Sequence, residues 1–290
     1  MGIVDSHIHL YPAEVNRDPA AWAAKTGEAH WATLCTRRRS DGRAVQAFPS
    51  ADELIREMDL AGVERAVLLG WYWEKPETCR WQNRFFGECV QAHPGRLAAF
   101  ATLHPRAGHW PALEELHRAR DEGLVGIGEL SPHAQGYGVD DSVFREVLTL
   151  AADWKMPVSL HVSDPERRDY PGRVATPLSD FTRLARECPA TKFVLAHWGG
   201  LLPLHDPAAL ELENIFYDTA ASPLLYDEDI WKKFLSVVPE DRVMFGSDYP
   251  LNLFPKLDAA PDMTRLIAQA KAAGVSEAVL GGNAERMLAR

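Results

Sequence analysis

The sequence predicts a (β/α)8 barrel, an α/β fold in which eight parallel strands alternate with helices. Three observations support this prediction: eight short apolar runs, helix-like stretches between them, and the lack of a linker-like segment. The 290 residues slightly exceed the roughly 250 that are typical of such barrels, so we expect one domain over residues 1–290. A Rossmann-like open sheet is the alternative, but no G-x-G-x-x-G motif follows the first run.

The eight runs are rich in β-branched and apolar residues. They cover residues 3–9, 65–70, 97–103, 126–130, 157–162, 192–197, 214–218 and 242–248. Several are continuously apolar, as expected for strands that are buried on both faces of a parallel sheet.

Helix signals lie between these runs. The clearest helix covers residues 51–61, because Ser50 and Glu53 have the spacing of a capping box and Gly62 is a typical helix end. Further helices are predicted over residues 112–122, 140–154, 177–187, 228–238 and 261–273. An additional C-terminal helix is expected within residues 276–290.

A long insertion, residues 11–48, follows the first predicted strand. Usual strand-to-helix connections have roughly 2–6 residues, and in barrels they form the active-site face. We therefore interpret the insertion as a lid or substrate collar; the alternative is an excursion with no role in the site.

Composition narrows the choice of partner. The net charge of -10 argues against a nucleic-acid partner. The sequence contains no run of about 18 apolar residues, so we expect no membrane span. The one basic cluster, Arg37–Arg39, is either a solvated loop or an attractor for an anionic substrate.

The four cysteines form no C-x-x-C pair, so we expect reduced thiols in a cytoplasmic protein. The oligomeric state is open, with a homodimer as the commonest soluble assembly.

Polar residues at the strand ends predict a metal site. His7 and His9 alternate on the first strand, so both side chains leave the same face. His161, His197 and Asp248 lie near the ends of the fifth, sixth and eighth runs, and a barrel gathers these ends around one axis. Histidine and carboxylate donors without cysteine are typical of a catalytic site for Zn²⁺ or a similar divalent ion such as Mn²⁺.

The motifs together resemble the amidohydrolase superfamily, and in particular the amidohydrolase 2 group of hydrolases and nonoxidative decarboxylases. They are Val4–His9, Ser159–His161, Leu195–Gly200, Phe245–Pro250 and Gly282–Leu288. The resemblance covers nearly the whole chain and implies the (β/α)8 fold. It also implies that His7, His9, His161 and Asp248 bind the more buried metal. His197 would either polarise the substrate or bind a second ion.

Glu129, near the end of the fourth run, has two interpretations. Some related branches place a glutamate on this strand to contact the metals, so Glu129 could bridge two ions. Alternatively, it hydrogen-bonds a metal-binding histidine. The number of ions is therefore one or two.

Several other residues are candidates for contact with a small-molecule substrate. They follow strand ends on the expected active-site face and are Trp71, Trp73, His104, His133 and Trp198. For the aromatic segment 71–73 the alternative is packing beneath the lid, and for the two histidines it is local hydrogen bonding.

The expected activity is hydrolysis of an ester, lactone or amide. In this scheme a metal-activated water attacks the carbonyl carbon, Asp248 transfers the proton and His197 stabilises the developing oxyanion. The alternative is nonoxidative decarboxylation of an aromatic or unsaturated carboxylic acid, which the aromatic segment 71–73 also suits. A barrel that only binds a ligand is a third hypothesis, which the full set of polar strand-end residues disfavours.

Overall fold

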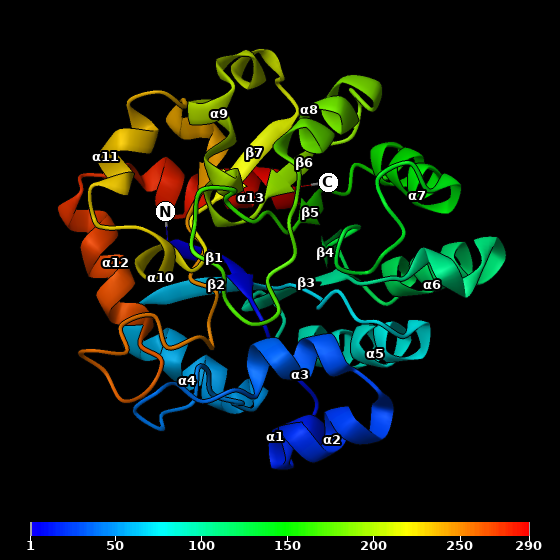
Figure 1. The fold of residues 1–290 in the computed structure, drawn as a ribbon, viewed down its shortest axis with the longest axis horizontal. Helices are drawn as coiled ribbons and strands as arrows, with labels where there is room; N and C mark the ends of the chain where they lie inside the picture. The colour runs from blue at the N-terminus through cyan, green and yellow to red at the C-terminus, as the bar shows by residue number, and fades with distance from the viewer. Residues whose placement is uncertain (1, 290) are drawn as a thin grey trace.

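Eight parallel strands form the centre of the molecule in the order β1 to β8 (Figure 1). The computed structural model describes residues 2–289. The strands are β1 Ile3–Ile8, β2 Val63–Leu68, β3 Leu97–Ala101, β4 Gly126–Leu130, β5 Val158–Leu160, β6 Phe193–Leu195, β7 Ile215–Asp218 and β8 Val243–Met244. The ring closes between β1 and the segment after β8, where Ser6 N donates to Phe245 O at 2.9 Å and His9 N donates to Tyr249 O at 2.8 Å. The predicted (β/α)8 fold is confirmed.

Each predicted strand is present, but β5, β6 and β8 are shorter than the apolar runs suggest. His161 lies near the end of its run and His197 and Asp248 end theirs, and all three residues lie beyond the regular pairing. His161 N still donates to Leu130 O at 2.8 Å and Asp248 N to His7 O at 2.9 Å, so these residues stay against the neighbouring strands beyond the regular ladder. Sequence periodicity marks the apolar residues but not the point at which pairing stops.

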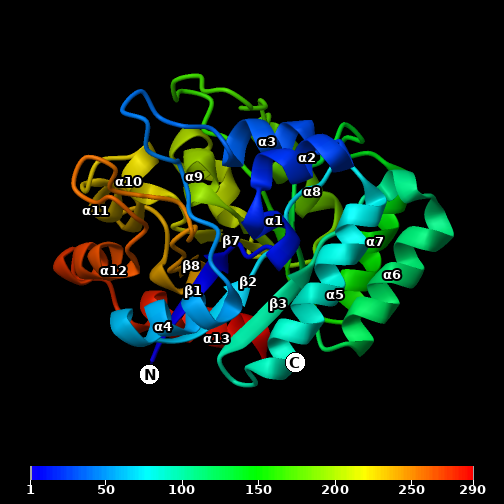
Figure 2. The same ribbon diagram turned by 90° about the horizontal axis from the view of Figure 1, so that it is seen from below.

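Helices surround the barrel (Figures 1 and 2). The longer ones are α4 Ala51–Ala61, α5 Pro76–Ala92, α6 His109–Asp121, α7 Ser142–Asp153, α8 Leu178–Glu187 and α12 Met263–Ala272. Shorter ones are α9 Leu202–His205, α10 Ser222–Leu225, α11 Ile230–Leu235 and the C-terminal α13 Asn283–Leu288. The Ser50 capping box of α4 is formed, with Ser50 Oγ accepting from Glu53 N. None of the helices among residues 2–289 has the length and apolar composition needed to cross a membrane.

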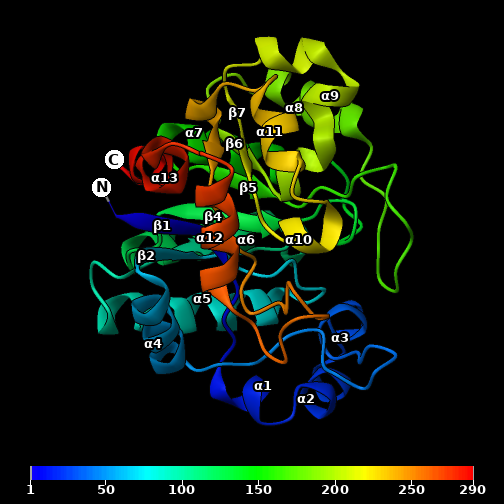
Figure 3. The ribbon, with the colours of Figure 1, turned by 90° about the vertical axis from the view of Figure 1, so that its left-hand side faces the viewer.

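The insertion at 11–48 is more ordered than a long loop. It contains α1 Ala13–Arg17, α2 Pro19–Thr26 and α3 Ala29–Cys35. These helices pack on a separate aromatic cluster in which Trp31 and Trp73 are fully buried. Figure 3 shows α3 on the side of the barrel opposite the two chain ends and α13. The insertion therefore covers the face where the parallel strands end.

Candidate metal centre and catalytic cavity

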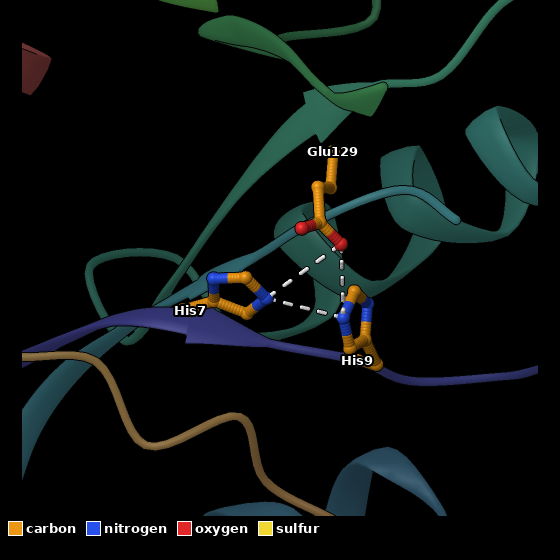
Figure 4. A group of neighbouring side chains, drawn as sticks. All are labelled: His7, His9 and Glu129. Atoms are coloured by element: carbon orange, nitrogen blue, oxygen red, sulfur yellow. Dashed lines mark hydrogen bonds and ion pairs between the residues drawn. The ribbon is translucent and has the colours of Figure 1, made fainter. Parts of the chain in front are cut away.

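Six polar side chains from five strands meet at the carboxyl ends of the barrel. The Nε2 atoms of His7 and His9 lie 3.2 Å apart, and Glu129 Oε2 lies 3.9 Å and 3.7 Å from them (Figure 4). Asp248 Oδ1 lies 3.7 Å from His7 Nε2 and 3.5 Å from His9 Nε2. Convergent nitrogen and oxygen atoms at this spacing are suited to holding a divalent ion.

The second carboxylate oxygen of Glu129 faces the other two histidines. Glu129 Oε1 lies 3.0 Å from His161 Nδ1 and 3.5 Å from His197 Nε2, and those two nitrogens are 3.2 Å apart. Glu129 thus belongs to two groups of potential ligands. The first also contains His7 and His9, and the second also contains His161 and His197. The geometry allows Glu129 to bridge two ions, and it also allows a hydrogen bond to His161.

The backbone is unusual at two of these positions. His197 has φ = 59° and Asp248 has φ = 67°, in the left-handed region that residues other than glycine seldom adopt. Asp248 N donates to His7 O at 2.9 Å, which fixes the turn after β8 against β1. Such conformations concentrate at functional sites, where the surrounding structure imposes them.

Other buried groups orient the histidines. Asp218 Oδ2, at the end of β7, accepts from His7 Nδ1 at 2.9 Å, and Oδ1 accepts from His197 N at 2.9 Å. The carbonyl of Leu69 lies 3.1 Å from His9 Nδ1. Sequence reasoning missed Asp218; the signal was a carboxylate at the end of the seventh run, the same position that identified the other site residues.

Burial and the charges of neighbouring side chains shift the pKa values of the clustered residues. Burial opposes a charge on His7, but Asp218, Asp248 and Glu129 outweigh it and raise the pKa of His7 to about 10. Burial and the nearby His7 charge lower the pKa of His9 to about 3. Burial raises the pKa of Asp248 to about 6, against the opposing effect of His7 and His197. Acids and bases with such separated pKa values are typical of catalytic sites.

The cluster lies at the wall of a cavity of about 620 Å³. Trp71 and Tyr72 form an aromatic wall, with ring centroids 4.5 Å apart and planes at 23°. Five arginines also line this space: Arg37, Arg39, Arg167, Arg168 and Arg173. A cavity of this size, with an aromatic wall and guanidinium groups, is suited to a small planar anion.

The sequence matches the family described as amidohydrolase, of the amidohydrolase 2 type, over residues 4–290. This chain belongs to the amidohydrolase 2 family.

Several proteins similar to this chain are decarboxylases. It is 24% identical to 2-amino-3-carboxymuconate-6-semialdehyde decarboxylase of Dictyostelium discoideum, covering 98% of this chain and 91% of that protein. The solved structure of 5-carboxyvanillate decarboxylase from Sphingomonas paucimobilis has a TM-score of 0.70 at 19% identity, covering 99% and 98% of the two chains. Dihydroxybenzoic acid decarboxylase from a Polaromonas species, solved with manganese and the inhibitor 2-nitroresorcinol, has a TM-score of 0.67 at 19% identity, covering 99% and 96%.

These relatives correct the expected activity. The prediction of a hydrolase acting on an ester, lactone or amide is wrong, because the similar proteins are decarboxylases and match the alternative hypothesis. The predicted ligands do not distinguish hydrolysis from decarboxylation, because a divalent ion can polarise the substrate oxygens in either reaction. Room for a second ion beside Glu129 does not define the reaction either.

The other predicted substrate contacts of this amidohydrolase separate into two sets. Trp71 lines the cavity, whereas Trp73 points into the aromatic cluster of the insertion and donates to Gln82 Oε1 at 2.6 Å. Trp198 points away from the cavity and donates to Ser222 Oγ at 3.0 Å.

The two further histidine candidates also lie outside the cavity lining. His104 Nδ1 accepts from Arg106 N at 3.2 Å. His133 Nε2 lies 2.9 Å from Asp180 Oδ2. Both make the local hydrogen bonds that formed the alternative interpretation of these residues.

Proposed function

We propose that this protein is a metal-dependent nonoxidative decarboxylase of a small aromatic or unsaturated carboxylic acid. The observation that carries the proposal is the cluster of four histidines and two carboxylates, placed beside a cavity with an aromatic wall and arginine side chains. The decarboxylase relatives support the reaction class, and two of them act on carboxylated rings.

The donor set fits a divalent ion. Imidazole nitrogens and carboxylate oxygens converge within a few ångströms, and the cluster includes no thiolate. His7, His9, His161 and Asp248 would hold the ion, with Glu129 and His197 available to it or to a second one. The ion is Zn²⁺ or Mn²⁺, and manganese is the metal bound in a solved relative. When bound, it supplies positive charge that holds and polarises the substrate oxygens.

The chain supplies the proton. Asp248 is buried beside the cavity, where its carboxyl group is placed to act as the general acid, and in the metal-free protein burial raises its pKa to about 6. It delivers a proton to the carbon that bears the carboxylate. The bond between that carbon and the carboxylate then breaks, the electron pair stays with the organic product, and CO₂ leaves. His197, with Nδ1 3.8 Å from Asp248 Oδ2, holds the acid in place.

The aromatic wall and the arginines position the substrate. Trp71 and Tyr72 offer a flat apolar surface to a ring, and the guanidinium groups attract its negative charge. Exclusion of water by the surrounding insertion strengthens these interactions.

The test is CO₂ release by protein loaded with Mn²⁺ or Zn²⁺ and incubated with hydroxylated ring acids, including 2,6-dihydroxybenzoate and 5-carboxyvanillate. In D₂O the product should carry one deuterium at the carbon that lost the carboxylate. Recovery of every acid unchanged, across both metals and a panel that includes unsaturated open-chain acids, contradicts the proposal.

A further inference from the structure

The loop between β5 and α8, residues 161–177, brings a tyrosine to the cavity. Residues 165–169 and 171 are exposed, whereas Tyr170 is half-buried and lines the cavity. The reaction proposed for the cluster does not use this side chain. Its placement results from how the loop is held at its base and at its tip.

The base of the loop is closed by paired hydrogen bonds. Ser163 N donates to Thr176 Oγ1 at 2.7 Å, and the same hydroxyl donates to Ser163 O at 3.2 Å. Arg173 reaches back to donate to Asp164 O at 2.9 Å and pairs with Asp169 at 2.8 Å. The loop therefore leaves and rejoins the barrel at nearly the same point.

The tip of the loop is attached to the insertion. His30, near the start of α3, lies with Nε2 2.8 Å from Gly172 O. Gly172 has φ = 86°, and a Cβ atom there would lie 2.8 Å from Leu34 Cγ, so the loop backbone rests directly on α3. Figure 3 shows this loop and α3 on the same side of the barrel. The contact at Gly172 therefore connects the loop that follows β5 with the insertion.

His30 also packs on the aromatic wall formed by Trp71 and Tyr72. The His30 ring lies 5.8 Å from the Tyr72 ring, and the Tyr72 ring lies 5.1 Å from His161. Movement of His30 would therefore disturb both the loop and the wall beside the metal ligands.

Tyr170 lines the same cavity as His161 and Asp248. Burial raises the pKa of Tyr170, against the opposing effects of a hydrogen bond with Ser163 and the charge of Arg173. A phenol is protonated at neutral pH, so the hydroxyl can donate a hydrogen bond. Ser163 Oγ in turn lies 3.4 Å from His161 Nε2. The hydroxyl is thus a donor at the edge of the space that a substrate bound at the cluster would occupy.

We propose that Tyr170 contacts the substrate, donating its hydroxyl hydrogen to an oxygen substituent of a ring acid, and that His30 is a positioning residue that holds Tyr170 there. The identity of the ligand as a ring acid rests on the proposed function, whereas the contact itself rests on the loop geometry. Tyr170 then selects substrates that carry an oxygen acceptor beside the reacting carboxylate.

The experiment measures binding of 2-nitroresorcinol, a ring compound with oxygen substituents, to manganese-loaded protein by quenching of tryptophan fluorescence. Tyr170→Phe should weaken binding about tenfold, the effect of losing one hydrogen bond of about 1.4 kcal/mol. Tyr217→Phe is the matched control, because that buried hydroxyl lies outside the cavity lining and has no hydrogen-bond partner among residues 2–289. Its affinity should match that of the wild type.

His30 is tested by two substitutions. His30→Ala should weaken binding as Tyr170→Phe does, and His30→Gln, whose amide can still donate to Gly172 O, should recover most of the affinity. Metal content should be unchanged in all variants, since none of the substituted residues is a proposed metal ligand. For an acid that the enzyme accepts, Tyr170→Phe should raise KM more than it lowers kcat.

Equal affinity of Tyr170→Phe and the wild type overturns the inference, and so does failure of the wild type to bind the probe. If the protein releases CO₂ but Tyr170→Phe does not change binding of the probe, this inference is wrong and the proposed function stands. If Tyr170→Phe weakens binding but the protein releases no CO₂ from any acid, the contact stands and the proposed function is wrong.

Discussion

Asp218 on β7 accepts a hydrogen bond from Nδ1 of His7 on β1 at 2.9 Å, with both side chains fully buried. This contact directs the other ring nitrogen of His7 toward His9 and Glu129. The second oxygen of Asp218 accepts from His197 N, so one carboxylate fixes parts of two strands that carry site residues. A buried acid that orients a metal-binding histidine also increases its basicity as a ligand.

Asp218→Asn should lower the affinity for Mn²⁺ or Zn²⁺ by about 10-fold to 100-fold, because the amide is a weaker acceptor for the His7 N–H. The affinity is measured by competition with a chelator. Asp164→Asn is the control: Asp164 is also a buried carboxylate, but it lines the cavity and hydrogen-bonds Tyr226 rather than the clustered histidines. Equal metal affinity in the two variants would contradict the role given to Asp218.

The difference between predicted and missed residues has a physical cause. His7 and His9 could be paired from sequence because strand alternation fixes the face from which each side chain leaves. Asp218 also ends a strand, but only the barrel shows that it faces His7 rather than a helix. Trp73 and Trp198 lie beyond strand ends, where loop dihedral angles decide direction. At Trp198 a left-handed φ of 58° accompanies a side chain that points away from the cavity.

Tyr170 shows the same limit more clearly. It lies ten residues beyond β5 (Leu160) in a run of exposed polar residues, and no periodicity connects it with the site. Its position depends on a hydrogen bond between His30 and Gly172, which are far apart in sequence. The barrel and the strand-end ligands follow from local patterns, whereas the substrate-facing loops depend on long-range contacts.

Glu129→Gln should reduce the number of ions bound per chain. Each oxygen of Glu129 faces a different pair of histidines, so loss of its charge weakens both groups of ligands. Elemental analysis gives the result: about two ions in the wild type and about one in the variant identify Glu129 as a bridging ligand. An unchanged content would assign it to hydrogen bonding with His161.

Asp248→Asn should reduce kcat for CO₂ release by about 10²–10⁴-fold, because an amide cannot supply the proton. Asp248 is also a proposed ligand, so metal content and the folded circular dichroism spectrum are measured on the same sample. A folded, metal-loaded variant with near-normal turnover would remove Asp248 as the acid.

Asp5 predicts a pH dependence of stability. It is fully buried, its Oδ2 has no hydrogen-bond partner among residues 2–289, and burial raises its pKa from 3.8 to about 6. The folded state therefore binds this proton more tightly than the unfolded state. Its contribution to stability is fully present below pH 3.8 and is lost as pH rises to about 6.

In metal-free protein, urea unfolding should show this loss as a decrease of about 2–3 kcal/mol in the free energy of unfolding. Other titrating groups add their own pH dependence, so the effect of Asp5 is obtained by comparison with a variant. Asp5→Asn cannot ionise, so the difference between wild type and variant should change across this pH interval. Parallel pH profiles would mean that Asp5 is ionised in the folded protein.

Arg38 and Arg39 are neighbours with different surroundings. Arg39 is half-buried and lines the cavity, its Nη2 donates to Asn252 O at 3.1 Å, and its Nε has no partner among residues 2–289. Burial, then repulsion from Arg37, lowers the pKa of Arg39. Arg38 is exposed, donates to Gly42 O at 2.8 Å and does not line the cavity.

Arg39→Gln should therefore raise KM for a ring acid about tenfold with little change in kcat, since a charged hydrogen bond to a partly screened carboxylate contributes about 1.4 kcal/mol. Arg38→Gln removes the same charge one residue away and should change KM less than about twofold, because an exposed charge is screened by salt. Steady-state kinetics at two salt concentrations separates the two effects. If both variants raise KM equally, and salt abolishes the increase, the basic segment acts through long-range attraction rather than through a contact made by Arg39.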